Sequence, residues 1–324
     1  MTVSKTKFRY RFLKILTGSD LSRRRIPYMV ARSETKGPVL WLTACIHGDE
    51  VGGMVIIHEI FRILRKRGLQ CGEIHAFPLM NPIGFETRSR MITVSKEDLN
   101  RSFPGNPSGS LAERIAHAIF TAIVGTSPDI IIDLHNDWIK SIPYVPVDIV
   151  SGSRHEEIMR KTAELARGTG FIVVDDDEDT SGTLTYSLME SGISAIPIEL
   201  GESYIVNEEN VRFGVQSVMN MLVIHDMIAH EHDTFRHYTL ERSEGRKLTF
   251  SHKPFSSTSG IIRFLVRPGD LVCVDQPVAR IYNSFGKLRE TVTADMNGIV
   301  LGHSDSSVAY PGAPVFAFGV FSDT

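Results

Sequence analysis

Apolar and polar positions follow two different periods along the first two thirds of the chain. Largely apolar segments of strand length occur at residues 39–44, 73–79, 129–134 and 195–200. Apolar residues repeat with helical spacing at residues 51–64, 110–124, 156–168 and 210–228. This succession of strands and helices predicts an α/β fold, in which a mixed sheet is flanked by helices.

Both ends of the chain depart from this succession. Residues 8–32 alternate apolar and basic side chains on both sides of the turn sequence Thr17-Gly18-Ser19-Asp20, a pattern that predicts a β-hairpin at a sheet edge. After Ala229 the chain changes to short β-rich segments separated by glycines, which predicts a smaller all-β domain. We place the catalytic domain at residues 1–234 and the C-terminal β domain at residues 235–324.

Two polar segments could be mistaken for metal sites. The joint at residues 230–237 holds three histidines, but no carboxylate stands at a convincing ligand spacing, and we interpret it as a solvated linker. The acidic run at residues 175–179 is interpreted as an exposed loop, because such runs are usually solvated.

Residues with metal-binding chemistry follow two of the predicted strands. His47 and Glu50 lie on the turn after residues 39–44, and His135 ends the run at 129–134. The carboxyl ends of parallel strands collect ligands at one edge of a sheet. Two histidines and one carboxylate are a known ligand set for catalytic zinc, with the fourth position left to water. We therefore predict that His47, Glu50 and His135 bind one Zn²⁺ ion per chain.

Composition limits the classes of partner. The formal net charge of -3 does not favour nucleic acid, and we expect a small-molecule substrate instead. No apolar run is long enough to span a bilayer, and basic residues interrupt the N-terminal segment where a secretion signal would be apolar. The three cysteines are scattered, and we expect them to be reduced and mostly buried. These features predict a cytoplasmic protein without a membrane partner.

Several further strings resemble the succinylglutamate desuccinylase and aspartoacylase family, a branch of the zinc carboxypeptidase-like fold. The most specific string runs from Asp98 to Gly105 and reads Asp-Leu-Asn-Arg-Ser-Phe-Pro-Gly. The others are His47-Gly48-Asp49-Glu50, Asn81-Pro82-Ile83-Gly84-Phe85, Asp133-Leu134-His135 and Glu199 at its strand end. The resemblance covers essentially the whole chain and implies a carboxypeptidase-like catalytic domain.

The resemblance also implies roles for arginines and an asparagine. Asn100 and Arg101 would bind a substrate carboxylate, since a guanidinium can hold a carboxylate through two parallel hydrogen bonds. The alternative is that the pair only caps its loop. Arg90 would polarise the scissile carbonyl and stabilise its oxyanion. Arg88, two residues earlier, could take that role, and the sequence leaves this open.

By the same resemblance, Glu199 would be the general base that accepts a proton from the attacking water. A surface salt bridge at a strand end is the alternative for this residue. Asp133 stands two residues before His135 and so shares its face of the strand, where it either orients the histidine or remains a solvated charge.

The predicted reaction is hydrolysis of the amide bond of a small N-acyl amino acid or N-acylated amine. A metallocarboxypeptidase acting on short peptides is the alternative that uses the same residues. Glu202-Ser203-Tyr204 and Asn136-Asp137-Trp138 replace the glycines that many family members carry, and this leaves the substrate open.

The C-terminal domain resembles a biotinyl or lipoyl carrier, which suggests a barrel-sandwich and a third candidate function as a non-catalytic carrier or binding protein. The segment at residues 281–286 lacks a Met-Lys-Met, so we expect Lys287 to be an ordinary hairpin lysine. The domain either shields the pocket or joins subunits of a homo-oligomer.

Overall fold

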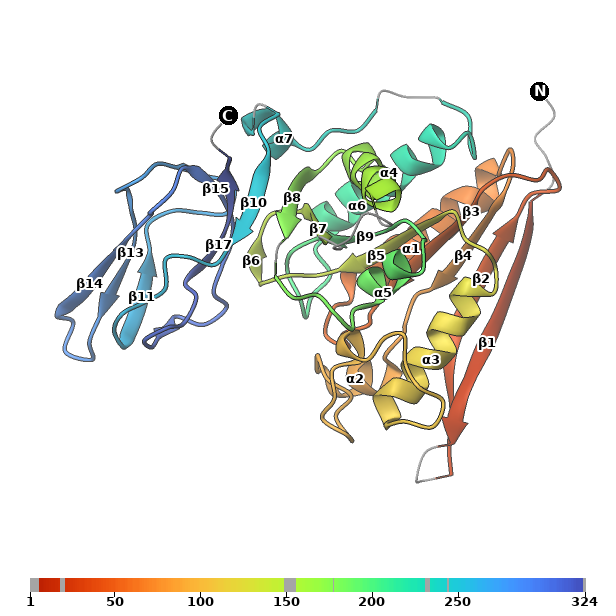
Figure 1. Cartoon of the computed structure of the whole chain (residues 1–324), viewed down its shortest axis with the longest axis horizontal. Helices are drawn as coiled ribbons and strands as arrows, with labels where there is room; N and C mark the ends of the chain where they lie inside the picture. The colour runs from red at the N-terminus through yellow and green to blue at the C-terminus, as the bar shows by residue number, and fades with distance from the viewer. Residues whose placement is uncertain are drawn as a thin grey trace.

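The structure is a computed structural model that describes residues 6–17, 21–148, 156–176, 178–230, 234–243 and 245–322 (Figure 1). Among these residues, no helix combines the length and the apolar character needed to cross a membrane. The predicted fold class is confirmed, because helices flank a large mixed sheet and a separate antiparallel sheet lies in the C-terminal part.

The large sheet begins with the strands of the catalytic part. Its order within the described residues is β1-β2-β4-β3-β5-β9-β7-β8, followed by four strands from the C-terminal part. The strands are β1 (Lys7–Thr17), β2 (Arg23–Arg32), β3 (Val39–Ala44), β4 (Glu73–Phe77), β5 (Ile130–His135), β7 (Tyr144–Asp148), β8 (Ile172–Asp176) and β9 (Ala195–Glu199). The strands β4, β3, β5 and β9 run parallel, so their carboxyl ends meet at one edge.

Helices cover both faces of this sheet (Figure 1). On one face the apolar sides of α1 (Gly52–Arg67), α4 (Glu156–Gly168) and α6 (Glu208–Ile224) pack on one core cluster. On the other face α2 (Pro82–Thr87), α3 (Leu111–Val124) and α5 (Leu184–Glu190) contribute to a second cluster, around Trp41 and Ile131. Because β3 and β5 are covered on both faces, they read as continuous apolar runs in the sequence.

The C-terminal part contributes to two sheets. The strands β10 (Leu248–Ser251), β12 (Leu271–Val272), β15 (Gly298–His303) and β17 (Phe316–Phe321) extend the large sheet, and β6 (Lys140–Ser141) pairs with β15. The strands β11 (Gly260–Phe264), β13 (Pro277–Tyr282), β14 (Leu288–Thr293) and β16 (Val308–Ala309) form the second sheet. The all-β prediction is confirmed, whereas the boundary between residues 234 and 235 stays a prediction.

The N-terminal hairpin is confirmed, since β1 and β2 pair antiparallel from Lys7 with Arg32 to Thr17 with Arg23. Residues 18–20 of its predicted turn lie outside the described residues. The expectation of mostly buried cysteines is wrong for Cys273, which is exposed on a loop, while Cys45 is buried and Cys71 is partly buried.

The prediction that residues 230–237 form a solvated linker is wrong for the last residue, His237. His237 is 1% exposed, donates or accepts a hydrogen bond with the Thr239 hydroxyl, and lies 4.7 Å from the Phe213 ring, centroid to centroid. It immediately precedes α7 (Tyr238–Arg242), and the aromatic side chains around it exclude water from the ring. Residues 231–233 of the joint lie outside the described part of the chain.

Candidate active site

The turn that carries His47 and Glu50 is shaped by a close approach of two backbones. A Cβ atom at Gly48 would lie 1.9 Å from the Gly84 carbonyl carbon of α2, so only glycine fits there. The Gly48 amide also donates to the Ser89 carbonyl at 3.0 Å. Asn81 caps α2 by accepting from the Gly84 amide at 2.8 Å. The Asn-Pro-Ile-Gly string of the sequence therefore supports the turn that carries His47 and Glu50.

The structure brings the three predicted ligands together. The ligand atoms of His47, Glu50 and His135 all lie within 4.8 Å of one another, and all three residues are buried. Nδ1 of His47 lies 2.6 Å from Oε1 of Glu50, and Nδ1 of His135 lies 3.0 Å from Oε2. Two imidazole nitrogens and one carboxylate thus converge from β5 and from the turn before α1, and the group could hold a metal ion.

The outer nitrogens of both rings face carboxylates, which is how proteins orient histidines on a metal. Nε2 of His135 is 2.8 Å from Oδ2 of Asp133, and the Asp133 side chain is fully buried. The other carboxylate oxygen, Oδ1, accepts a hydrogen bond from the Thr43 hydroxyl at 2.7 Å. Nε2 of His47 is 3.3 Å from Oδ1 of Asp98. These contacts leave Nδ1 of each ring for a metal, and the donor set therefore fits a zinc ion.

Electrostatics of this group also favour a cation. Burial disfavours the protonated imidazoles, but the carboxylates around them outweigh it and raise the pKa of both His47 and His135. Burial likewise favours neutral Glu50, yet the two imidazoles reverse this effect and lower the pKa of its carboxyl. Protons therefore balance the buried negative charge here, a role that a divalent cation can take over.

Glu199 ends β9 beside the predicted ligands. It pairs in register with His135 of β5, and its Oε2 is buried without a hydrogen-bond partner. Burial raises the pKa of the Glu199 carboxyl to about 8, His135 lowers it, and Asp137 raises it. A carboxylate at this place can exchange protons with water or substrate held at the ligand group.

Asn136 joins the ligand group to the segment after Glu199. Its backbone amide donates to Oε2 of Glu50 at 3.1 Å, and its side-chain amide donates to the Gly201 carbonyl at 2.6 Å. Its side-chain oxygen accepts from the Gly52 amide at the start of α1, at 3.1 Å. One side chain therefore fixes β5, α1 and the loop after β9 relative to each other.

Of the two candidate arginines, the structure brings Arg90 to the ligand group. Its Nη1 lies 3.4 Å from Nδ1 of His47 and 3.9 Å from Oε1 of Glu50, and its guanidinium pairs with Asp98 at 3.0 Å. Arg88 is the exposed C-cap of α2 and does not line the cavity at the ligands. Asp98 thus contacts both His47 and Arg90, a link that sequence analysis missed.

Asn100 and Arg101 both lie at the cavity, and each makes a hydrogen bond within the protein. Asn100 is buried, and its side-chain oxygen accepts a hydrogen bond from the backbone amide of Leu184 at 2.9 Å. This oxygen therefore has the capping role of the alternative interpretation. Arg101 is exposed and donates from Nη1 to the Asn100 carbonyl at 2.8 Å. Both residues line the cavity at the ligands, with other guanidinium donors of Arg101 available to a ligand.

The cavity at the ligand group has a volume of about 170 Å³. It lies where β7 and β9 separate, since these strands pair in register only at Tyr144 with Glu199 among the described residues. Pro146 and Pro197 line the gap and lack the amide hydrogens that a continued ladder would need. Asp137, noted in the sequence as a departure from the family pattern, and Asp176 of the acidic run also line the cavity. Sequence analysis missed the other residues of this wall, which are Asp148, Thr180, Thr183 and Thr185.

The interpretation of the acidic run as an exposed loop is wrong for its first two residues. Asp175 and Asp176 end strand β8, and Asp176 lines the cavity, because pairing with β7 and β10 continues the strand through them. Glu178 and Asp179 are exposed as expected, and residue 177 lies outside the described residues.

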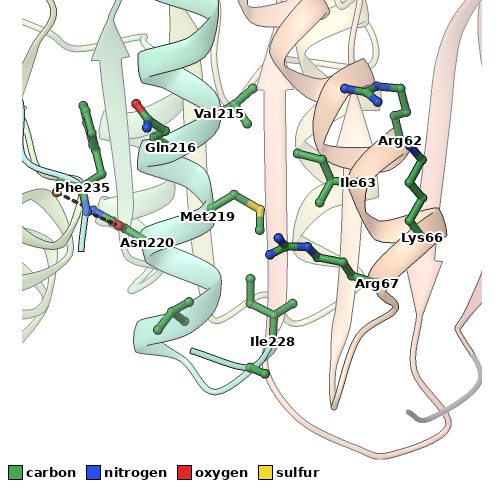
Figure 2. Close-up of a pocket in the computed structure, with 12 residues that line it drawn as sticks. Arg62, Ile63, Lys66, Arg67, Val215, Gln216, Met219, Asn220, Ile228 and Phe235 are labelled. Atoms are coloured by element: carbon green, nitrogen blue, oxygen red, sulfur yellow. Dashed lines mark hydrogen bonds between the residues drawn. The ribbon is translucent and has the colours of Figure 1, made fainter. Parts of the chain in front are cut away.

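A larger cavity of about 440 Å³ lies elsewhere, between α1 and α6, and Figure 2 shows its lining. Apolar side chains such as Ile63, Val215 and Met219 form much of it, and Arg62, Lys66 and Arg67 lie at one side. None of its lining residues is an acid, a histidine or a cysteine. The smaller cavity is therefore the candidate active site.

A family comparison agrees with this geometry. The sequence profile of the succinylglutamate desuccinylase/aspartoacylase catalytic domain matches residues 36–225. The chain belongs to this family. The match spans the ligand turn, the Asp98-to-Gly105 string, His135 and Glu199, so the resemblance inferred from the sequence motifs is confirmed.

Two known proteins resemble the chain along most of its length. An N-alpha-acetyl-L-2,4-diaminobutyric acid deacetylase of Halomonas elongata is 25% identical over 280 residues, which are 84% of this chain and 79% of that protein. The product-bound ectoine utilization protein EutE (DoeB) of Ruegeria pomeroyi superposes with a TM-score of 0.81 at 22% identity, covering 99% of this chain and 97% of that chain.

A metallo-carboxypeptidase from Burkholderia cenocepacia shares the fold more distantly. Its TM-score is 0.56 at 14% identity, and the match covers 66% of this chain and 64% of that chain. The carboxypeptidase-like architecture expected from the motifs is therefore confirmed as a fold.

Proposed function

We propose that this chain is a zinc-dependent deacylase that hydrolyses the amide bond of a small N-acyl amino acid or N-acylated amine. The observation that carries the proposal is the convergence of His47, Glu50 and His135 within 4.8 Å beside Glu199. The relative from Halomonas elongata, a deacetylase of an N-acetylated diamino acid, supports an amide-hydrolysing reaction.

His47, Glu50 and His135 would hold the zinc ion, and Asp98 and Asp133 would keep the two rings oriented toward it. A bound zinc ion supplies Lewis acidity, which activates water for attack on the amide carbonyl. Glu199 accepts the proton of the attacking water and passes one to the leaving nitrogen. Arg90 donates to the carbonyl oxygen as negative charge develops on it. Arg101 holds a carboxylate of the substrate.

The size of the cavity favours a small substrate over a peptide. About 170 Å³ is small compared with the cavities of 300 Å³ or more that usually enclose drug-sized ligands. A carboxypeptidase must also leave room for the residues that precede the scissile bond. The compact cavity therefore supports a deacylase within a fold that also serves peptidases.

A substrate panel tests the proposal. The zinc-loaded protein is incubated with acetyl and succinyl amino acids, acetylated diamines, N-acetyl-2,4-diaminobutyrate and tetrapeptides, and released amines are quantified. We expect turnover of one or more acylated compounds and none of the peptides, with Glu199→Gln as the inactive control. Release of C-terminal residues from peptides without turnover of any acylated compound would show a carboxypeptidase instead.

A further inference from the structure

One wall of the cavity carries carboxylates that the proposed metal ligands and general base do not explain. Asp148 ends β7 and Asp176 ends β8, and these two residues pair directly in the parallel register of the strands. Both line the cavity that contains His47, Glu50 and Glu199. Two carboxylates side by side repel each other, so their position at this wall calls for a reason.

Asp148 is the more deeply buried of the two. It is 4% exposed, and its Oδ2 accepts a hydrogen bond from the Thr185 hydroxyl at 3.1 Å. The Thr180 hydroxyl is its other side-chain donor, and no ion pair joins it to a cation among the described residues. A buried carboxylate is usually compensated by a cation, because neutral hydroxyls replace only part of its hydration.

The Asp148 carboxyl accordingly holds its charge at a cost. Burial raises its pKa to about 6, the Thr185 and Thr180 hydroxyls lower it, and the neighbouring Asp176 raises it. Arg101 lowers this pKa too, but it changes the pKa less than burial, the two hydroxyls or Asp176 does. The group is still mostly ionised above neutral pH, and a cation placed against it would remove the cost.

The other residues that line the cavity indicate which further chemical groups a ligand with such a cation would carry. Arg101 lines the same cavity and offers donors for a carboxylate. Pro146 and Pro197 provide an apolar surface in it. The cavity thus combines an arginine, a buried acid and an apolar surface, which suits a short chain with groups of opposite charge.

We propose that Asp148, with Asp176 beside it, binds a cationic amino group of the substrate, so that the enzyme acts on N-acylated diamino acids and diamines. The assignment rests on the proposed deacylase function and names the substrate class of the same site. Asp148 is then a specificity residue that contacts the far end of the substrate, while the reaction takes place at the metal ligands and Glu199.

Paired substrates test the assignment. The side chain of one Nα-acetyl amino acid carries an ammonium group on two, three or four methylenes, and its partner ends in a methyl group instead. For the wild-type protein we expect kcat/KM to favour the ammonium member of at least one pair by a factor of about 10 to 100, the range for a hydrogen bond between charged groups. Asp148→Asn should bring that ratio close to one.

Asp179→Asn is the matched control, because Asp179 is exposed on the neighbouring loop and does not line the cavity. It should keep the wild-type ratio. A ratio near one in the wild-type protein, or a wild-type ratio in Asp148→Asn, would overturn the assignment while leaving the deacylase function intact.

Binding of the free amino acids provides a readout that does not depend on turnover. Calorimetry on the metal-loaded protein should show that one diamino acid binds about 10 to 100 times more tightly than its methyl-ended partner, and that Asp148→Asn removes the difference. If no acylated compound is hydrolysed, the deacylase proposal fails, and these titrations still decide whether Asp148 selects a cation. Equal affinities for both members of every pair would contradict it.

Discussion

His135 and Glu199 stand directly opposite each other on the neighbouring parallel strands β5 and β9. The proposed ligand and the proposed base are therefore held by backbone hydrogen bonds of the sheet rather than by loops. A substitution at Glu199 can change the proton transfer without disturbing the ligands.

The first prediction follows from this arrangement. Glu199→Gln keeps the shape of the side chain but removes its basicity, and kcat should fall by a factor of about 10² to 10⁴ with the metal still bound. Steady-state kinetics and metal analysis on the same sample check both parts. Glu202→Gln is the control, since Glu202 does not line the cavity and its Oε2 accepts from Asn207. Near-normal turnover by Glu199→Gln would mean that another group is the base.

The second prediction concerns the metal. The purified protein should contain about one zinc ion per chain and lose activity when the ion is removed, because two imidazoles and one carboxylate form a site for catalytic zinc. Combined His47→Ala and His135→Ala should abolish binding, whereas His58→Ala, at an exposed position on α1, should not. Elemental analysis gives the stoichiometry. Full activity after exhaustive demetallation would refute the zinc assignment.

The third prediction concerns Asp98, which contacts Nε2 of His47 and the guanidinium of Arg90. Asp98→Asn should weaken metal affinity by a factor of about 10 to 100, because the carboxylate orients the ring and raises its basicity. Competition with a chromogenic chelator measures this affinity. An unchanged affinity would limit Asp98 to its other contacts, the ion pair with Arg90 and the cap that it forms on the Asn100 amide at 2.8 Å.

The fourth prediction separates substrate binding from chemistry. Arg101→Ala should raise KM for substrates with a carboxylate by a factor of about 10 to 100 and change kcat much less, since it removes a charge-assisted hydrogen bond. Acylated diamines, which lack the carboxylate, serve as the internal comparison and should lose little. Arg88→Ala, at the exposed end of α2, is the matched variant that should leave KM unchanged.

The fifth prediction uses the raised pKa of Asp148, about 6 in the folded protein against an ordinary value of 3.8. Between these values the folded state holds a proton that the unfolded state has lost, so this group's contribution to stability falls as pH rises through 6. At pH 8 the cost amounts to about 2 to 3 kcal/mol. Asp148→Asn should therefore raise the free energy of unfolding of the ligand-free protein at pH 8.

The same variant should lose this advantage near pH 4, where the wild-type carboxyl is protonated. Chemical denaturation at both pH values measures the difference. A destabilised Asp148→Asn at pH 8 would indicate that the carboxylate serves mainly to organise Thr180 and Thr185, and that the buried charge is not retained for a ligand.

Sequence patterns located His47, His135 and Glu199 because each follows an apolar run, and such runs mark strands that are buried on both faces. Gly48 and Asn81 were visible only as members of family strings. These two residues allow the turn with His47 and Glu50 to pack closely against α2. That contact joins segments more than thirty residues apart in the chain, so the sequence pattern does not predict it.

The cavity wall that carries Asp148 and Asp176 could not be predicted from the sequence, for physical reasons. Strand β7 contains Pro146 and follows Pro143, so its sequence pattern does not predict a strand. Asp148, at the end of this strand, was therefore not predicted as a site residue. Asp176 belongs to a run of acids whose composition indicates a loop, although β7 and β10 hold it in a sheet. Strand pairing between distant segments places these two residues in the sheet, and local sequence propensity does not predict that pairing.

The continuation of the large sheet into the C-terminal part determines what that part can be. Strand β10 pairs parallel with β8, through Leu248 with Val174 and Thr249 with Asp175, and β17 pairs with the other side of β10. A fragment that ended before β10 would expose the backbone donors and acceptors of β8 as an open edge, which promotes aggregation. It would also leave the strand that ends at Asp176 paired on one side only, with β7. The C-terminal segment therefore supports the cavity wall that carries Asp176, and the catalytic part should not be expected to work when expressed without it.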